Sequence, residues 1–153
     1  MDYFIFQQLN TLVGKSVCLD GLAIFFAEYL EYFLAVLVFL VLWKKWGGIL
    51  QAFVAGILAR WGIIEIIRFF WQRPRPLIEY TEPSFPSGHA AFFFALSFVV
   101  YQNNKKAGLF FFGASCFVVT SRVYLGFHWF SDIVAGALIG ILVAWLVLKF
   151  FRK

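Results

Sequence analysis

Long apolar stretches dominate the sequence and are separated by short polar breaks. A run of about 20 apolar residues is long enough to span a membrane as a helix. The third run is shorter, and it reaches that length only if its helix begins near Ser87, where Pro86 suits the start of a helix. The pattern predicts about five membrane-spanning helices, at residues 22–43, 48–70, 90–101, 107–124 and 133–151.

Residues 1–20 show a weaker, two-sided pattern. Apolar side chains recur at helical spacing and polar side chains occupy the opposite side, which indicates an amphipathic helix. Such a helix suits the membrane surface, and a cap packed on the bundle is the alternative. The apolar side holds Ile5, Phe6, Leu9, Leu12, Val13 and Val17, and the polar side holds Gln7, Gln8, Asn10, Thr11 and Lys15.

The composition is that of a membrane protein. The chain has 153 residues, of which 63% are hydrophobic and 14% are charged. Soluble domains carry about 25% charged residues, so this chain lacks the polar surface that coats a water-soluble globule. Because lipid offers no hydrogen bonds to the backbone, we predict an all-α polytopic membrane helix bundle. We expect one domain over residues 1–153, with the functional motifs within residues 48–151.

The charged residues indicate the orientation of the bundle. The net charge is +5, but the basic residues are scattered between apolar runs, which argues against a nucleic-acid partner. A purely basic set lies at the ends of the first, third and fifth runs, and the positive-inside rule makes that side cytoplasmic. The set comprises Lys44, Lys45, Lys105, Lys106, Lys149, Arg152 and Lys153. The opposite side, with acids, arginines, prolines and both histidines, is expected to face outward.

Three groups of residues on the outward side indicate an anion site: the first lies within residues 68–76, the second within 86–89 and the third within 121–132. Neighbouring guanidinium groups repel one another unless an anion lies between them, and arginine binds phosphate through paired hydrogen bonds. Arg68, Arg75 and Arg122 are therefore predicted to clamp a phosphate group. Ser87 and Gly88 stand at the start of a helix, where free backbone N–H groups bind anions, and Ser87 adds a hydroxyl donor.

The two histidines of the chain accompany these arginines. His128 and Asp132 are four residues apart, so the carboxylate can orient one imidazole nitrogen and leave the other as a nucleophile. His89 has no acid nearby in the sequence, which favours a role as the general acid for the leaving oxygen. The pattern predicts phosphoryl transfer through a phosphohistidine on His128, without a cofactor.

A metal site is the weaker interpretation of the same residues. Two histidines and one aspartate could bind zinc, but the surrounding arginines would repel a cation, so no metal is expected. Cys18 and Cys116 have neither metal spacing nor a disulfide framework, and we interpret them as apolar packing residues.

Other charged residues lie near the predicted span ends. Glu65 precedes Arg68 by three residues and is expected to pair with it or with Arg60, because an unpaired charge inside a span is costly; a place in the lining of the cavity is the alternative. Arg73 is either a fourth phosphate contact or a solvated residue. Glu31 is expected at the membrane interface, and a place at the border of substrate entry is the alternative.

In order and spacing, the three groups resemble the signature of the type 2 phosphatidic acid phosphatase (PAP2) superfamily, which also includes vanadium haloperoxidases. The resemblance covers residues 68–132. It implies His128 as the nucleophile, Asp132 as its partner and His89 as the acid. It also implies five phosphate binders: Arg68, Arg75, Ser87, Gly88 and Arg122. Two departures stand out: the first basic position of the family is usually Lys and here is Arg68, and many members have six spans.

The resemblance implies a metal-independent membrane hydrolase of lipid phosphates or diphosphates. Residues 77–85 alone separate the first two groups, which is too short for a cap domain over the site. By similarity to small bacterial members in size and topology, we expect undecaprenyl diphosphate as the substrate, with phosphatidylglycerophosphate or phosphatidate as the alternative. Two other functions stay open. One is a non-enzymatic lipid-phosphate binder or flippase, although a binder needs no nucleophile. The other is vanadate-dependent oxidation.

The expected location is the bacterial cytoplasmic (inner) membrane, with the site facing the periplasm or exterior. The expected partners are the bilayer and the lipid substrate, and the oligomeric state stays open.

Overall fold

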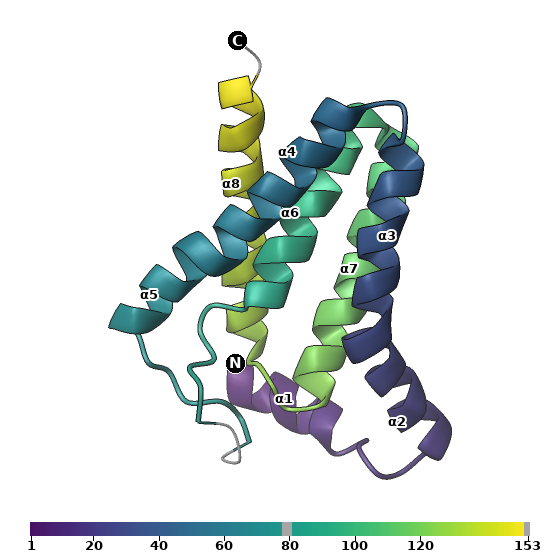
Figure 1. Ribbon diagram of the computed structural model, residues 1–153. Helices are drawn as coiled ribbons and strands as arrows, with labels where there is room; N and C mark the ends of the chain where they lie inside the picture. The colour runs from purple at the N-terminus through teal and green to yellow at the C-terminus, as the bar shows by residue number, and fades with distance from the viewer. Residues whose placement is uncertain (78–80, 152–153) are drawn as a thin grey trace.

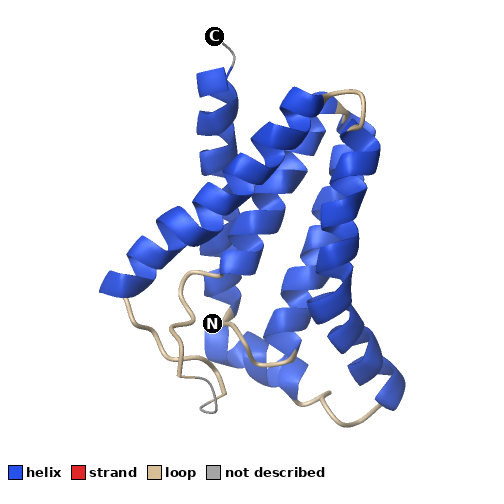
Figure 2. Ribbon diagram, viewed as in Figure 1, coloured by secondary structure: helices blue, strands red, loops and turns tan. Residues whose placement is uncertain are grey.

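The computed structural model of the protein describes residues 1–77 and 81–151, and Arg152 and Lys153 of the basic set lie outside them. Every regular element of the described chain is a helix (Figure 2), which confirms the all-α prediction. Two of the elements, η1 and η2, are π-helical turns. The elements are α1 (Asp2–Asn10), α2 (Val17–Ile24), η1 (Phe25–Tyr29), α3 (Leu30–Leu42), α4 (Trp46–Ile57), η2 (Leu58–Ile64), α5 (Glu65–Phe70), α6 (Gly88–Asn103), α7 (Lys105–Tyr124) and α8 (Phe130–Phe151).

Four helices of the described chain are long and apolar enough to cross a membrane. Elements α2, η1 and α3 form the continuous helix Val17–Leu42, and α4, η2 and α5 form Trp46–Phe70; α7 and α8 are the other two. The protein is thus an integral membrane helix bundle. The predicted third span corresponds to α6, which starts after Ser87 as expected but has only 16 residues, or about 24 Å.

Helix α6 lies at the centre of the bundle, which explains why it need not match the thickness of the membrane. It packs against α3, α4, α7 and α8 (Figure 1). Most of its residues are buried, whereas the other long helices expose many large apolar side chains on their outer faces. Protein therefore surrounds α6, and the other helices meet the lipid.

Two glycines of α8 allow it to pack closely on α6. A Cβ at Gly136 would lie 2.3 Å from the Ser87 carbonyl oxygen, and one at Gly140 would lie 2.1 Å from the Ala91 carbonyl oxygen. Small residues at membrane helix interfaces permit such close backbone approach. The Ser87 N–H also donates to the Asp132 carbonyl at 3.0 Å. The start of α6, which carries the second sequence group, and the start of α8, which carries Asp132 of the third, are therefore fixed against each other.

The N-terminal region is not one amphipathic helix over residues 1–20, so that prediction was wrong in extent. Helix α1 ends at Asn10, and Gly14 in the following turn has a φ of 78°. This left-handed conformation suits glycine and interrupts a helix. The Ser16 side chain then caps α2, so the first span begins at Val17.

Helix α1 forms a packed cap on the bundle. It contacts α7 and α8 near the ends that carry the third sequence group (Figure 1). Phe6 is buried there, and its ring packs edge to face on Trp129 at a centroid distance of 5.6 Å.

The two ends of the bundle differ in the way the sequence pattern indicates. The α3–α4 connection, the α6–α7 connection and the end of α8 lie together, opposite the N-terminus and the loop after α5 (Figure 1). Lys45 Nζ donates to the Asn103 carbonyl at 3.1 Å, which links the first two connections. The lysine-rich breaks therefore share one end, and the three sequence groups share the other.

Candidate active site

The three sequence groups meet in one cavity of about 420 Å³. Arg68 reaches it from α5, His89 from the start of α6 and Arg122 from the end of α7, while Arg75 and His128 come from loops. The described residues that line the cavity are Arg60, Arg68, Arg75, Thr81, Glu82, Gly88, His89, Arg122, Phe127 and His128. The cavity is therefore rich in cations and contains both histidines.

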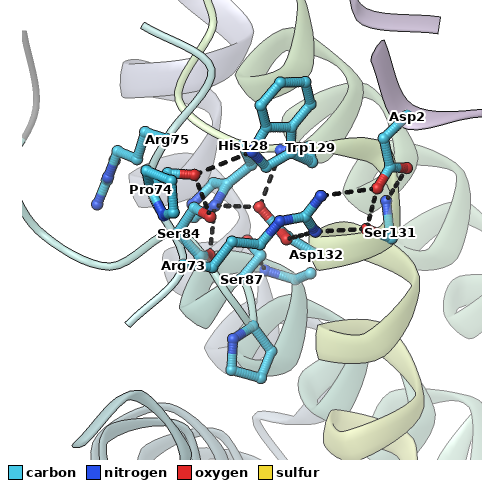
Figure 3. Close-up of polar contacts among 12 residues, drawn as sticks. Asp2, Arg73, Pro74, Arg75, Ser84, Ser87, His128, Trp129, Ser131 and Asp132 are labelled. Carbon is cyan, nitrogen blue, oxygen red and sulfur yellow. Dashed lines mark hydrogen bonds and ion pairs between the residues drawn. The ribbon is translucent and has the colours of Figure 1, made fainter. Parts of the chain in front are cut away.

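His128 is almost fully buried, with 2% of its surface exposed, and lines the cavity. Its Nδ1 lies 2.9 Å from the Ser84 carbonyl oxygen (Figure 3). A carbonyl oxygen only accepts hydrogen bonds, so Nδ1 carries the proton and Nε2 of the neutral ring keeps its lone pair. Burial lowers the pKa of His128, with the charges of Arg75 and Arg68 adding to this effect and Asp132 opposing it. The neutral ring with a free Nε2 is the form that a nucleophile needs.

Asp132 lies behind His128, and its carboxylate is fully buried. Its Oδ2 is 3.6 Å from His128 Nδ1, close enough for an ion pair but too far for a hydrogen bond. Oδ2 instead accepts the Trp129 N–H at 2.8 Å, and Oδ1 accepts Arg73 Nη1 at 2.8 Å. The sequence pattern assigned the orientation of His128 to Asp132 alone. In the structure the Ser84 carbonyl orients the ring, and Asp132 contributes a nearby negative charge.

Arg73 connects Asp132 to the N-terminal helix (Figure 3). Its Nη1 also donates to Ser131 Oγ at 2.7 Å, and its Nη2 donates to Asp2 Oδ2 at 2.9 Å. Burial opposes the ionisation of Asp2, but hydrogen bonds from Ser131 and Arg73 outweigh it and hold the pKa of this carboxyl below its ordinary value. Arg73 is thus a structural link between α1 and the site, which neither predicted role described.

The start of α6 contributes to the site through its backbone. Ser87 is fully buried, and its Oγ accepts the Ala90 N–H at 3.4 Å, so this side chain caps the helix and does not line the cavity. Gly88, the first residue of the helix, does line the cavity. It presents the positive end of the α6 dipole to any anion bound there.

Two of the predicted clamp arginines pair with partly exposed carboxylates. Arg68 Nη1 lies 3.1 Å from Glu65 Oε1, which confirms the predicted pairing of Glu65, and Arg75 Nη2 lies 3.4 Å from Glu82 Oε2. The side chains of Glu65 and Glu82 are 52% and 79% exposed. Ion pairs of this kind are weak, so a phosphate group can take the place of either carboxylate.

Glu31, which was expected at the membrane interface, reaches into the site from α3. Its Oε2 lies 3.2 Å from His89 Nε2 and 3.4 Å from Arg122 Nη2. Glu31 therefore supplies the acidic neighbour that His89 lacks in the sequence. Hydrophobic periodicity carried no signal for the contact between Glu31 and His89, because that contact depends on how the first span crosses α6 and α7.

Arg122 has an unsatisfied donor. Its Nη2 donates to the Ala27 carbonyl of the π-helical turn η1 at 2.8 Å. Its Nε is buried and has no hydrogen-bond partner within the described chain. A buried donor without a partner is costly unless a ligand satisfies it, so Arg122 is suited to receive an anion.

Arg60 is a cavity cation that the three-group pattern missed. It lies on the π-helical turn η2 of the second span, and a Cβ at Gly88 would meet Arg60 Cγ at 3.3 Å. Its guanidinium carbon lies 4.7 Å from the centroid of the Trp61 ring. A charge inside a span often marks a functional site, and this was the one sequence signal that pointed to Arg60.

The described residues contain no group of three or more His, Cys, Asp or Glu side chains arranged to hold a metal ion. Asp132, the carboxylate nearest His128, is already engaged by Arg73 at 2.8 Å. The donor set of the cavity consists mainly of guanidinium groups, which bind anions such as phosphate.

The chain is similar to known proteins in sequence and in fold. Residues 49–153 match the family model described as PAP2 superfamily, and this range contains all eight residues predicted for the site. The crystal structure of Aquifex aeolicus LpxE has a TM-score of 0.77 and 23% identity, covering 97% of this chain and 94% of that one. At this identity the likeness concerns the fold.

Two bacterial relatives match nearly the whole chain. The bacitracin transport permease protein BcrC of Bacillus licheniformis is 31% identical over 157 residues, which cover 93% of this chain and 76% of the relative. The undecaprenyl-diphosphatase BcrC of Bacillus subtilis (strain 168) is 28% identical over 166 residues, which cover 98% of this chain and 84% of the relative.

Proposed function

The chain belongs to the PAP2 superfamily, and on that basis we propose that it is a membrane phosphatase that hydrolyses undecaprenyl diphosphate through a phosphohistidine. The observation that carries the proposal is the position of His128. Its Nδ1 is hydrogen-bonded to the Ser84 carbonyl, and its ring lines a cavity with four arginines. The alignment with a relative named undecaprenyl-diphosphatase covers 98% of the chain, which supports this choice of substrate.

In the first step Nε2 of His128 attacks the terminal phosphorus, and the bond between that phosphorus and the bridging oxygen breaks. The proton stays on Nδ1 and keeps its hydrogen bond to the Ser84 carbonyl, and the charge of Asp132 at 3.6 Å stabilises the positive charge that develops on the ring. His89 gives a proton to the leaving oxygen. The bound phosphate favours the protonated form of His89, because it brings negative charge beside the imidazole.

In the second step a water molecule attacks the phosphohistidine and loses a proton to His89, which now acts as a base. The bond between phosphorus and Nε2 breaks, inorganic phosphate leaves, and His128 returns to its neutral form. Arg68, Arg75 and Arg122 stabilise the charge on the phosphoryl oxygens in both steps. Gly88 adds the positive end of α6.

We also propose that the protein lies in the bacterial cytoplasmic membrane with this cavity on the outer side. The lysine-rich connections at the opposite end of the bundle support that orientation under the positive-inside rule. A lipid diphosphate of the outer leaflet would then reach the arginines directly.

Transport without hydrolysis is the competing function, and it matches the word permease in the name of one relative. A binding site needs the arginines but not an imidazole with a free Nε2. The burial of His128 and its hydrogen bond to Ser84 favour hydrolysis.

The test is phosphate release by the purified protein in detergent, from a panel of undecaprenyl diphosphate, phosphatidylglycerophosphate and phosphatidate, with EDTA present. We expect release from undecaprenyl diphosphate at a rate that chelation does not change. Loss of activity on chelation, restored by Mg²⁺ or Zn²⁺, would contradict the mechanism. Release from the two glycerophospholipids alone would contradict the substrate.

A further inference from the structure

The four arginines of the cavity divide into two pairs, one at each histidine. Arg122 contacts the same Glu31 oxygen as His89, at 3.4 and 3.2 Å, whereas the charges of Arg75 and Arg68 act on His128. Arg60 also lies on the side of His89, because a Cβ at Gly88, the residue before His89, would lie 3.3 Å from Arg60 Cγ. The cavity thus offers two adjacent cationic regions.

In-line phosphoryl transfer assigns each region a part of the substrate. The nucleophile and the leaving group lie on opposite sides of the transferred phosphoryl group. If His128 attacks, the leaving group lies on the side of His89. For a lipid monophosphate the leaving group is an alkoxide, whereas for a lipid diphosphate it is itself a phosphate. The second phosphate of a diphosphate therefore falls in the region of Arg60 and Arg122.

The depth of Arg60 in the membrane agrees with this orientation of the substrate. It precedes Arg68 by eight residues on the helix Trp46–Phe70, which places it about 12 Å further from the outer end. Its neighbour Trp61 is 55% exposed on the apolar outer surface of the bundle. Arg60 thus lies toward the hydrocarbon, on the side from which the lipid tail of the substrate must extend.

We propose that Arg60, which lies with Arg122 on the side of His89, binds the lipid-side phosphate and selects lipid diphosphates over lipid monophosphates. This inference deepens the proposed function and rests on the roles of His128 and His89 given there. Arg68, Arg75 and Arg122 each have a carboxylate within 4 Å. Among the described residues Arg60 has no such ion pair, and its charge is offset at longer range by Glu31 and Glu65. Its guanidinium is therefore the cavity cation whose hydrogen bonds are most available to a second phosphate.

The experiment compares initial rates on a prenyl diphosphate and on the monophosphate with the same tail. Arg60→Gln should lower kcat/KM for the diphosphate by about 10- to 100-fold, the loss expected for hydrogen bonds to a charged group. The monophosphate should change by about twofold or less. Arg60→Lys, which keeps a charge without the paired donors, should fall between wild type and Arg60→Gln. Lys149→Gln is the matched control, because it removes one positive charge at the opposite end of the bundle.

A second measurement does not depend on turnover. Binding of a prenyl methylene-bisphosphonate and of the matching phosphonate is measured on the wild type and on Arg60→Gln. The wild type should bind the bisphosphonate more tightly, and Arg60→Gln should lose that preference. A folded variant with a weakened subsite still binds the phosphonate, whereas a variant that fails to fold binds neither ligand.

The outcomes separate the two proposals. If no lipid phosphate is hydrolysed but the wild-type preference for the bisphosphonate exists and depends on Arg60, the proposed function fails and the subsite stands. If Arg60→Gln weakens both substrates equally, changes neither, or leaves the bisphosphonate preference intact, the subsite is refuted, whatever the activity of the wild type.

Discussion

Replacing Arg73 by Gln tests the network that joins the N-terminal helix to the site. Arg73 Nη1 lies 2.8 Å from Asp132 Oδ1, and the Asp132 side chain is 0% exposed. The replacement keeps a polar side chain but removes the positive charge. The buried carboxylate would then retain the Trp129 N–H as a donor and lose its ion-pair partner.

The magnitude follows from burial. Breaking a buried ion pair by removing one partner costs about 3–5 kcal/mol. The Arg73 side chain is 27% exposed, so water can partly replace it and the lower end, about 3 kcal/mol, is expected. The accompanying loss of the partly exposed Asp2 contact adds about 1 kcal/mol or less. For a chain of this size, 3 kcal/mol corresponds to a fall in Tm of about 6–12 °C.

The assay is thermal unfolding in detergent, with a double-mutant cycle. Asp132→Asn removes the buried charge, so adding Arg73→Gln to it should lower Tm much less than Arg73→Gln lowers the wild-type Tm. Arg75→Gln is the matched control, two residues away, because its partner Glu82 is 79% exposed. We expect it to change Tm by less than about 2 °C while removing most of the activity.

Two results would refute this reasoning. One is an unchanged Tm in Arg73→Gln, which would mean that water or another cation satisfies Asp132. The other is equal destabilisation by Arg75→Gln, which would mean that the loop responds to any lost guanidinium.

Other predictions concern the chemistry and the orientation. His128→Ala should abolish the acid-labile, base-stable phosphoenzyme formed from radiolabelled substrate, whereas His89→Ala should slow turnover by about 10²–10⁴-fold and less on an aryl phosphate; label that persists only in His128→Ala would reverse the two roles. Because burial lowers the pKa of His128, its neutral form should persist as the pH falls, and the acid limb of kcat/KM should lie below the ordinary histidine value of about 6.5. An acid limb above pH 7 would contradict a neutral nucleophile. Thr81→Cys, in a background without Cys18 and Cys116, should react with an impermeant thiol reagent in intact cells; reaction only after lysis would reverse the orientation.

The bundle itself was predictable because membrane spans have a simple requirement. Each must be long and apolar, and the four full-length spans were all visible as apolar runs. The start of α6 near Ser87 was also predictable, because Pro86 and the length that a span needs both favoured that position. The break in the N-terminal helix was missed, because the apolar spacing continued through Gly14 while the backbone there turned to a φ of 78°.

The main residues of the site were predictable for a related reason. Each group is short and local: two arginines around one loop, a helix start with a histidine, and a histidine with an aspartate one turn later. Charges beside a span are costly, so they draw attention even in a single sequence. The sequence therefore predicted the arginines and histidines that meet in the cavity, and the roles it gives them remain predictions.

Only the tertiary structure decided how those residues are held. The Ser84 carbonyl that orients His128 is 44 residues away in the chain, and the Asp2 that engages Arg73 is 71 residues away. Glu31 reaches His89 from the first span, and Arg60 lies beside Gly88. No periodicity or spacing encodes these contacts, because they depend on where helices cross and on the path of the loop between α5 and α6. Hydropathy determines that a helix lies in the membrane, whereas close packing against α6 determines which of its polar side chains face the site.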